Sequence, residues 1–162
     1  MLAWRTSKAK RSKDLTGKGA AIYGGRWNKV DDAALYMGLT HAITVLETLV
    51  HFNGSATVGM KSVLFELPED PLLYLRPKIS ELPDGWESIP QSDQSMNFGS
   101  NWLKSNSHLG LIVPSAIAPL ESNIIINPHH PAASHIKVKQ EYDFSFDQRL
   151  LELLDGAGKL EV

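Results

Sequence analysis

The sequence predicts an α+β fold, in which short apolar strands and amphipathic helices follow one another along a single domain of residues 1–162. Two observations support this prediction. Residues 40–53 repeat apolar side chains at helical spacing, and several short runs in both halves of the chain have the apolar pattern of strands. The composition, 43% apolar and 21% charged, is that of a globular domain with enough chain to bury a core.

The expected elements are short and closely spaced. We expect strands at 2–5, 33–39, 60–67, 72–75, 109–113, 123–127, 136–139 and 142–146, and helices at 40–53, 92–104 and 147–154. Residues 7–20 read as a loop, residues 77–90 as an ordered surface crossing around Trp86, and the tail from Gly156 as frayed. Alternation predicts that Leu35 and Met37 face the core while Tyr36 faces the opposite side. It also points Val63, Phe65 and Leu67 inward.

The helix at 40–53 has clear end signals. Thr40 suits the N-cap, and Gly54 stands where a left-handed residue commonly follows a helix. Glu47 lies about 40° from Ile43 around the helix axis, on the margin of the apolar face. A carboxylate at such a margin either forms a salt bridge or lines a cleft, and the spacing by itself favours the salt bridge.

The segment Tyr23-Gly24-Gly25-Arg26-Trp27-Asn28 combines two glycines with three side chains suited to binding. Glycine lets the backbone approach a ligand closely, and arginine presents a fork of donors that matches phosphate or carboxylate. A plain turn with an exposed arginine and a half-buried tryptophan is the alternative.

Composition restricts the class of protein. Without cysteine there is no disulfide framework and no thiolate metal site. Residues 1–6 lack the apolar core of a signal peptide, and no run approaches the roughly 18 apolar residues of a membrane span. We therefore expect a soluble, cytoplasmic protein.

Charge is unevenly distributed although the net charge is only −2. Half of the 16 basic residues fall at or before Lys29, against the single acid Asp14. This segment suits an anionic ligand, with a solvated basic arm as the alternative for 8–13. Direct nucleic-acid binding is not expected, because such a domain is normally basic as a whole.

Two other motifs have plainer explanations. Ser115 follows an apolar strand without the Gly-x-Ser-x-Gly elbow of a hydrolase, so a turn serine is the simpler interpretation. The histidines of Asn127-Pro128-His129-His130-Pro131, with His135 beyond, match no zinc spacing, and the two prolines favour a rigid turn. We predict no metal site.

Taken together, the motifs resemble those of the RES-domain proteins, toxins of bacterial toxin–antitoxin pairs whose antitoxins are Xre-like. The resemblance runs along nearly the whole chain, in order. Its blocks are Trp4-Arg5, Gly19-Ala20, Tyr23 to Asn28, Leu35-Tyr36, Leu46-Glu47 with Val50-His51, Leu82-Pro83-Asp84-Gly85-Trp86, Trp102-Leu103, Val113-Pro114-Ser115-Ala116, Asn127-Pro128 with His130-Pro131, and Phe146-Asp147-Gln148-Arg149-Leu150.

The resemblance implies a mixed, split β-sheet with flanking helices, like the ADP-ribosyltransferase domains of diphtheria-type toxins, around an NAD cleft. It implies an enzyme that destroys NAD+ and a cognate Xre-like antitoxin that restrains it within a hetero-oligomeric complex. The family's polar active-site set falls on Arg26, Tyr36, Glu47 and Ser115. Arg5, Trp27 and Asn127 are further candidates for substrate binding, beside Arg26 and Tyr36.

The chemistry assigns an expected role to each group. Cleavage of the nicotinamide–ribose bond builds positive charge on the sugar, which the carboxylate of Glu47 would stabilise. Arg26 would hold the pyrophosphate or a phosphate co-substrate, Tyr36 would stack against the substrate, and Ser115 would orient Glu47 or bind the nicotinamide amide. Arg26 and Glu47 should then meet opposite ends of one dinucleotide-sized hollow.

Three outcomes stay open. Water or phosphate as the acceptor of ADP-ribose is favoured over a protein, because position 45, two before Glu47, is Val rather than a second Glu or Gln. Transfer of ADP-ribose to a protein is the alternative within the same chemistry. A non-catalytic partner-binding module is the alternative from another class. The substrate is NAD+, with no bound cofactor expected.

Overall fold

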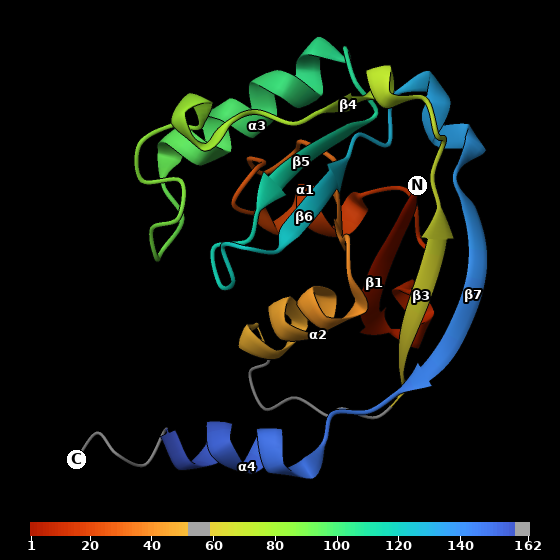
Figure 1. Cartoon of the computed structure of the whole chain (residues 1–162), viewed down its shortest axis with the longest axis vertical. Helices are drawn as coiled ribbons and strands as arrows, with labels where there is room; N and C mark the ends of the chain where they lie inside the picture. Colours follow the sequence, from red (N-terminus) through yellow and green to blue (C-terminus); the bar gives the residue numbers. More distant parts are fainter. Residues whose placement is uncertain (52–58, 158–162) are drawn as a thin grey trace.

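The computed structural model describes residues 1–51 and 59–157, and it confirms the predicted α+β class. A seven-stranded mixed sheet has the order β4-β5-β6-β2-β1-β3-β7 (Figure 1). The β4–β5 pair is parallel and the other neighbouring pairs are antiparallel. The strands are β1 (Leu2–Lys8), β2 (Leu35–Gly38), β3 (Met60–Glu66), β4 (Tyr74–Leu75), β5 (Gly110–Pro114), β6 (Ser122–Ile126) and β7 (Lys137–Phe144).

Two of the helices begin at a capping hydroxyl, and the sequence predicts the cap at Thr40. Thr40 caps α2 (His41–Val50) by accepting a hydrogen bond from the Ile43 N–H at 3.2 Å. Ser92 caps α3 (Asp93–Ser105) in the same way through the Ser95 N–H. The predicted last residue of the helix at 40–53, Asn53, and its predicted end signal, Gly54, lie outside the described residues. Figure 1 shows α4 (Gln148–Ala157) beyond the sheet, past the end of β7.

The sheet consists of two parts that meet at one residue pair. Strands β1 and β2 pair only at Trp4 and Gly38, whereas β1 and β3 pair along seven residues. The strands β4-β5-β6-β2 form one part and β1-β3-β7 the other. This is the split sheet that the family resemblance implies, and α2 contacts β1, β2 and β6 across the junction.

The strands predicted at 136–139 and 142–146 are one strand, β7. The structure corrects the prediction because β3 supplies a continuous partner: Phe65 pairs with Val138 and Leu64 with Gln140. Lys139 is therefore an extra residue, a β-bulge that interrupts the apolar alternation along this strand. In the sequence, such an interruption of the alternation looks like the end of one strand and the start of another.

The region 7–20, predicted as a loop, contains more structure. Strand β1 continues to Lys8 because Ser7 and Lys8 pair with Lys61 and Met60 of β3. The short 3-10 helix Ala9–Arg11 follows, and α1 (Lys18–Tyr23) begins before the predicted loop ends. Residues 7 and 8 are part of a strand because they pair with β3, and the local polarity of the sequence does not reveal this pairing.

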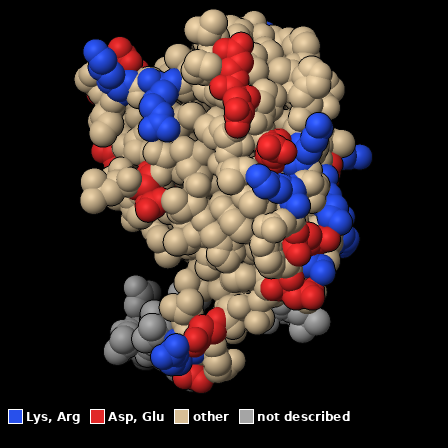
Figure 2. All heavy atoms as spheres, turned by 45° about the vertical axis from the view of Figure 1, so that its right-hand side comes forward, with Lys and Arg blue, Asp and Glu red and all other residues tan. Residues whose placement is uncertain are grey.

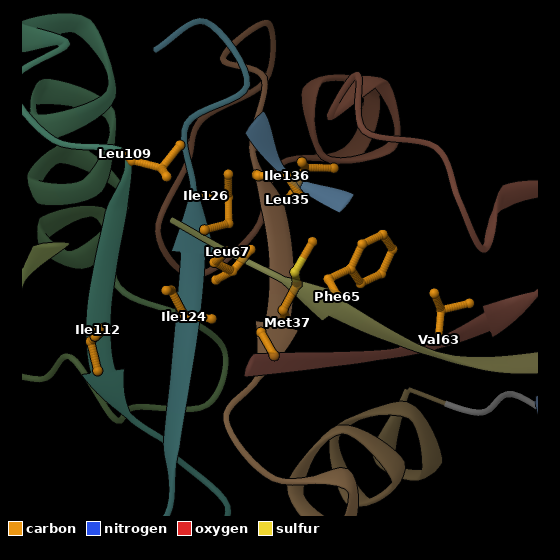
Figure 3. Packing of buried hydrophobic residues seen from close by; sticks show 11 residues of the cluster. Leu35, Met37, Val63, Phe65, Leu67, Leu109, Ile112, Ile124, Ile126 and Ile136 are labelled. Carbon is orange, nitrogen blue, oxygen red and sulfur yellow. The ribbon is translucent and has the colours of Figure 1, made fainter. Parts of the chain in front are cut away.

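Apolar side chains are buried on both faces of the sheet, whereas the edge strand β7 is exposed along most of its length. The face bearing Leu35, Met37 and Phe65 packs with side chains from β6 and with the segments around Leu109 and Ile136 (Figure 3). The opposite face carries Tyr36 and packs under α3 and the 82–86 crossing. The positions predicted to point inward are all buried: Leu35, Met37, Val63, Phe65 and Leu67. Burial does not alternate along β3, because Ser62 and Leu64 on its other face are buried as well.

The helix α3 packs unusually close to the turn at Trp27. A side chain at Gly99 would place its Cβ 2.0 Å from the Trp27 carbonyl oxygen. We therefore expect Gly99→Ala to lower the free energy of unfolding by about 1–3 kcal/mol or more, as overpacking does. Urea unfolding measures this, and Gly19→Ala is the control, because a Cβ at that helical position meets nothing within 4 Å. Equal stability of the two variants would contradict this packing.

The excess of basic residues near the N-terminus is partly balanced in the fold. Lys13 lies 2.7 Å from a Glu141 oxygen, and Lys61 lies 2.7 Å from an Asp143 oxygen, both acids being on β7. The hydrogen bond from Lys13 lowers the pKa of Glu141. Figure 2 shows acidic and basic side chains interspersed on this side of the molecule.

Within the described ranges, none of the helices has the length and apolar character that crossing a bilayer requires.

Candidate active site

Arg26 is fixed by the backbone of a distant segment. Gly25 and Asn28 pair through both of their backbone groups, which closes the turn that carries Arg26. The Nη1 atom of Arg26 donates to the carbonyl oxygens of Trp86, at 2.6 Å, and Ser88, at 2.9 Å. Both acceptors are neutral, and no acid of the described residues forms an ion pair with this guanidinium. Its positive charge therefore remains free to attract an anion.

Trp27 lies in the core rather than on the surface. Only 3% of it is exposed, and its ring stacks on Trp86 at 6.3 Å and meets Phe98 edge-on at 6.0 Å. Its predicted role in substrate binding stays a prediction, and the buried indole presents little area for a ligand. The packing indicates a structural role, because the ring fastens the Arg26 turn to the 82–86 crossing and to α3.

The hydroxyl of Tyr36 holds the Arg26 turn in place. It accepts a hydrogen bond from the Trp27 N–H at 2.9 Å and donates to Oδ1 of Asn28 at 2.8 Å. A Cβ at Gly25 would lie 2.7 Å from this hydroxyl, so a glycine is needed there. Burial raises the pKa of Tyr36, while the Trp27 N–H and the charge of Arg26 act in the opposite direction.

Asn28 completes this turn from inside. Its side chain is fully buried, and Nδ2 lies 2.9 Å from the carbonyl oxygens of Ala20, Lys29 and Asp32. An asparagine after Gly-Gly-Arg-Trp suggests a turn, but the sequence does not reveal that its amide bonds three separate carbonyls. Asn28 is thus a structural residue of the site, whereas its sequence context indicates only a turn former.

We expect the Tyr36→Phe variant to lose about 1–3 kcal/mol of unfolding free energy, because the buried Trp27 N–H and Asn28 Oδ1 lose their partner. Guanidinium unfolding monitored by tryptophan fluorescence gives the value. Tyr23→Phe serves as the control, since Tyr23 is 75% exposed. A Tyr36→Phe protein as stable as this control would show that the hydroxyl does not support the turn.

Glu47 is held by two neutral donors. Its Oε1 accepts hydrogen bonds from the Ser115 hydroxyl at 2.8 Å and from Nδ2 of Asn123 at 2.5 Å. The salt bridge that the helix spacing favours is absent among the described residues. The half-buried carboxylate has no cationic partner among the described residues.

The sheet register brings Tyr36 and the partners of Glu47 to the same face. Tyr36 lies opposite Ile125 on β6, and Asn123 lies two residues before Ile125 on the same strand. Alternate residues share a face, and a diagonal pair in an antiparallel ladder is about 7–8 Å apart. Val113 lies opposite Asn123, so Ser115, two residues beyond Val113, continues the same face. Tyr36, Ser115 and the Asn123 partner of Glu47 thus lie on one face of the sheet at β6. The turn that carries Arg26 joins them through its hydrogen bond to Tyr36.

Arg5 and Asn127 are engaged elsewhere. The Arg5 guanidinium donates to the Asp14 carbonyl oxygen at 2.5 Å, and burial lowers its pKa, partly opposed by the charge of Asp14. Asn127 is buried and donates to the Leu103 carbonyl oxygen at 2.9 Å and to Oδ1 of Asn106 at 3.1 Å. These bonds tie the end of β6 to the end of α3. Substrate binding by either residue remains a prediction.

Two hollows lie away from these groups. One, of about 300 Å³, is lined by Trp4, His41, Ser62 and residues of β7, and the other, of about 280 Å³, lies at the end of α3 around Asp32 and Asn127. Neither is lined by Arg26, Tyr36, Glu47 or Ser115. The single hollow predicted between Arg26 and Glu47 therefore stays a prediction.

The histidine-rich segment has a structural explanation. His130 caps the 3-10 helix Pro131–His135, its Nδ1 accepting from the Ala132 N–H at 3.2 Å. Throughout residues 1–51 and 59–157, no group of three histidine or acidic side chains is arranged to hold a metal ion. The rigid turn suggested by the two prolines accounts for the segment.

A family model described as the RES domain matches residues 2–147. The chain belongs to the RES-domain family. This match covers every element from β1 to the end of β7, including the four positions that the resemblance singles out.

Individual RES relatives are similar over most of their length. A protein of Sphingobium sp. (strain YBL2) named "Prs ADP-ribosylating toxin" is 38% identical over 153 residues, which is 91% of this chain and 95% of that protein. A "Toxin Res" of Yersinia enterocolitica is 38% identical over 137 residues, covering 83% of this chain and 89% of the relative.

The fold also matches a solved structure. A chain in the crystal structure of the M. tuberculosis MbcT–MbcA toxin–antitoxin complex superposes with a TM-score of 0.69 at 17% identity. The match covers 89% of this chain and 84% of that one. It supports the fold, which agrees with the predicted split-sheet architecture.

Proposed function

We propose that this RES-domain protein is a toxin that cleaves the bond between nicotinamide and ribose in NAD+. The observation that carries the proposal is the Glu47 carboxylate: it is held by Ser115 and Asn123, lacks a cationic partner among the described residues, and lies on the sheet face of Tyr36. Depletion of cytoplasmic NAD would arrest growth.

The proposed reaction uses the charge of Glu47 directly. As the C1′–N bond breaks, its electron pair leaves with the nicotinamide nitrogen, and positive charge develops on the ribose. The nearby carboxylate stabilises this charge, so that the transition state gains more than the substrate does. Nicotinamide departs as a neutral base and needs no general acid. An oxygen of water or phosphate then bonds to C1′ and loses a proton to the solvent.

Arg26 is the proposed site for the pyrophosphate. Its guanidinium has no acidic partner among the described residues, and its donors are oriented by the carbonyls of Trp86 and Ser88. In this proposal Tyr36 and Ser115 act mainly on the protein: Tyr36 fixes the Arg26 turn, and Ser115 orients Glu47. No bound cofactor takes part, and inorganic phosphate is a candidate co-substrate.

Transfer of ADP-ribose to a protein is the second candidate. The 38%-identical Sphingobium relative carries the name of an ADP-ribosylating toxin, which favours this outcome. Val45, two residues before Glu47, favours the small acceptors instead, since no second carboxylate stands there to activate a protein side chain.

A restraining partner belongs to the proposal. An enzyme that removes NAD must be blocked in its own cell, and a chain of a toxin–antitoxin complex has the same fold. We propose a cognate Xre-like antitoxin that covers the Glu47 face within a hetero-oligomeric complex.

One experiment separates these outcomes. The protein is produced by cell-free synthesis and mixed with NAD+ labelled in the adenine, with and without inorganic phosphate and with a bacterial lysate. Free nicotinamide together with ADP-ribose supports hydrolysis, and a phosphorylated ADP-ribose supports phosphorolysis. Label on a protein band supports the second candidate. Unchanged NAD+ in every arm overturns the enzymatic proposal and favours a partner-binding module.

A further inference from the structure

The Glu47 carboxylate is part of a closed ring of contacts. Starting from α2, Glu47 Oε1 accepts from the Ser115 hydroxyl, and the Ser115 backbone N–H donates to the Glu121 carbonyl oxygen at 2.9 Å. The Glu121 carboxylate then accepts from the Thr40 hydroxyl at 2.9 Å, and Thr40 is the N-cap of α2. The ring thus leaves the helix at Glu47 and returns to it at Thr40.

The direction of each hydrogen bond in this ring is determined. The Ser115 oxygen accepts from the backbone N–H groups of Ile117, at 3.1 Å, and Ala118, at 3.2 Å. Both of its acceptor positions are therefore used, and its one hydrogen points to Glu47. Ser115 is fully buried and presents no free donor to a ligand. Its contacts describe a support for Glu47.

Asn123 adds the second restraint. Its Nδ2 donates to the same Oε1 that Ser115 holds, at 2.5 Å, from the neighbouring strand. Two donors on one oxygen fix the rotation of the carboxylate plane. Both of these bonds go to Oε1, and none of the described residues donates to Oε2.

We propose that Asn123 and Glu121 are positioning residues for the Glu47 carboxylate. This rests on the proposed function, in which Glu47 stabilises charge on the ribose. Asn123 sets the rotation of the carboxylate through its hydrogen bond to Oε1. Glu121 joins the start of α2 to the Ser115 turn, which keeps Glu47 and Ser115 at hydrogen-bonding distance. Neither residue needs to touch the substrate.

The test compares nicotinamide release by four variants with that of the wild-type protein. Asn123→Ala should lower kcat about 10- to 100-fold, the range for loss of a hydrogen bond to a charged group, with a smaller change in KM for NAD+. Asn123→Asp keeps the side-chain volume but has no N–H to donate to Oε1, so it should lower kcat at least as much, again with a smaller change in KM.

Glu121 is tested by rescue. Glu121→Ala should lower kcat, whereas Glu121→Gln should restore most of it, because the amide oxygen still accepts from Thr40. Asn101→Ala and Glu87→Gln are the matched controls, since both side chains are exposed and neither forms a hydrogen bond of the ring. Circular dichroism and thermal melting confirm that each variant is folded before its kinetics are compared.

The outcomes separate the two proposals. A wild-type protein that releases no nicotinamide overturns the proposed function and this inference with it. An active wild type whose Asn123 variants keep the wild-type kcat overturns the role of Asn123. Equal activity of Glu121→Ala and Glu121→Gln overturns the role of Glu121. A reduced kcat with a smaller change in KM, together with rescue at position 121 by glutamine, supports the inference.

Discussion

Glu47→Gln is expected to lower the rate of NAD+ cleavage about 100- to 1000-fold or more, the range for removing one group that stabilises charge in a transition state. The substitution removes the negative charge while preserving the shape of the side chain. The glutamine oxygen can still accept from Ser115 and Asn123, which hold Oε1 in the wild-type protein. Stability should therefore change little while activity falls.

Nicotinamide release at saturating NAD+ measures this effect, and bacterial growth on induction measures it in the cell. Glu87→Gln, in the 77–90 crossing, is the control with the same chemical change. Turnover by Glu47→Gln at the wild-type rate would remove Glu47 from the mechanism. A large loss of stability would assign Glu47 to the fold instead.

Arg26→Ala is expected to reduce kcat/KM for NAD+ about 10- to 100-fold, mainly through a higher KM, as loss of a hydrogen bond between charged groups does. The variant loses the positive charge assigned to the pyrophosphate, and it also frees the carbonyls of Trp86 and Ser88. Arg26→Lys keeps a charge but not the planar fork, so it should recover only part of the affinity.

Steady-state kinetics and calorimetric titration of NAD+ against the inactive Glu47→Gln protein measure this change separately from chemistry. Arg76→Ala, outside the site, controls for the loss of one positive charge. If Arg26→Ala binds NAD+ as tightly as that control, the guanidinium serves only to hold the 82–90 segment, and the pyrophosphate lies elsewhere.

Local signals account for much of what the sequence predicts. The capping hydroxyl of Thr40 marks the start of α2, because a cap depends on residues only three positions apart. The alternation of Leu35, Tyr36 and Met37 gives the two faces of β2, because it too depends only on neighbouring residues. The order of short motifs identifies the family, although each motif is weak by itself.

The missing parts depend on contacts between distant residues. Asn123 lies 76 positions from Glu47, and no local pattern indicates that its amide reaches the carboxylate. The acceptors of Arg26 are about as remote, 60 and 62 positions away. Trp27 illustrates a different limit: a tryptophan after Gly-Gly-Arg has the same sequence context whether its ring meets a ligand or packs on Trp86. Only the fold distinguishes the two.

The two parts of the sheet share a single strand pair, Trp4 with Gly38, and the helix α2 packs on both parts across that junction. Ser115, Asn123 and Tyr36 lie on or directly after strands of the β4-β5-β6-β2 part, and Glu121 fastens the start of α2 to that part. At Thr48, one residue after Glu47, the side-chain hydroxyl donates to the Thr6 carbonyl oxygen of β1 at 3.2 Å. The helix that carries the acid is therefore also the brace between the two parts of the sheet. A substitution that loosens this brace on the β1 side would disturb the reaction centre from the far part of the sheet, without replacing any residue proposed to meet the substrate.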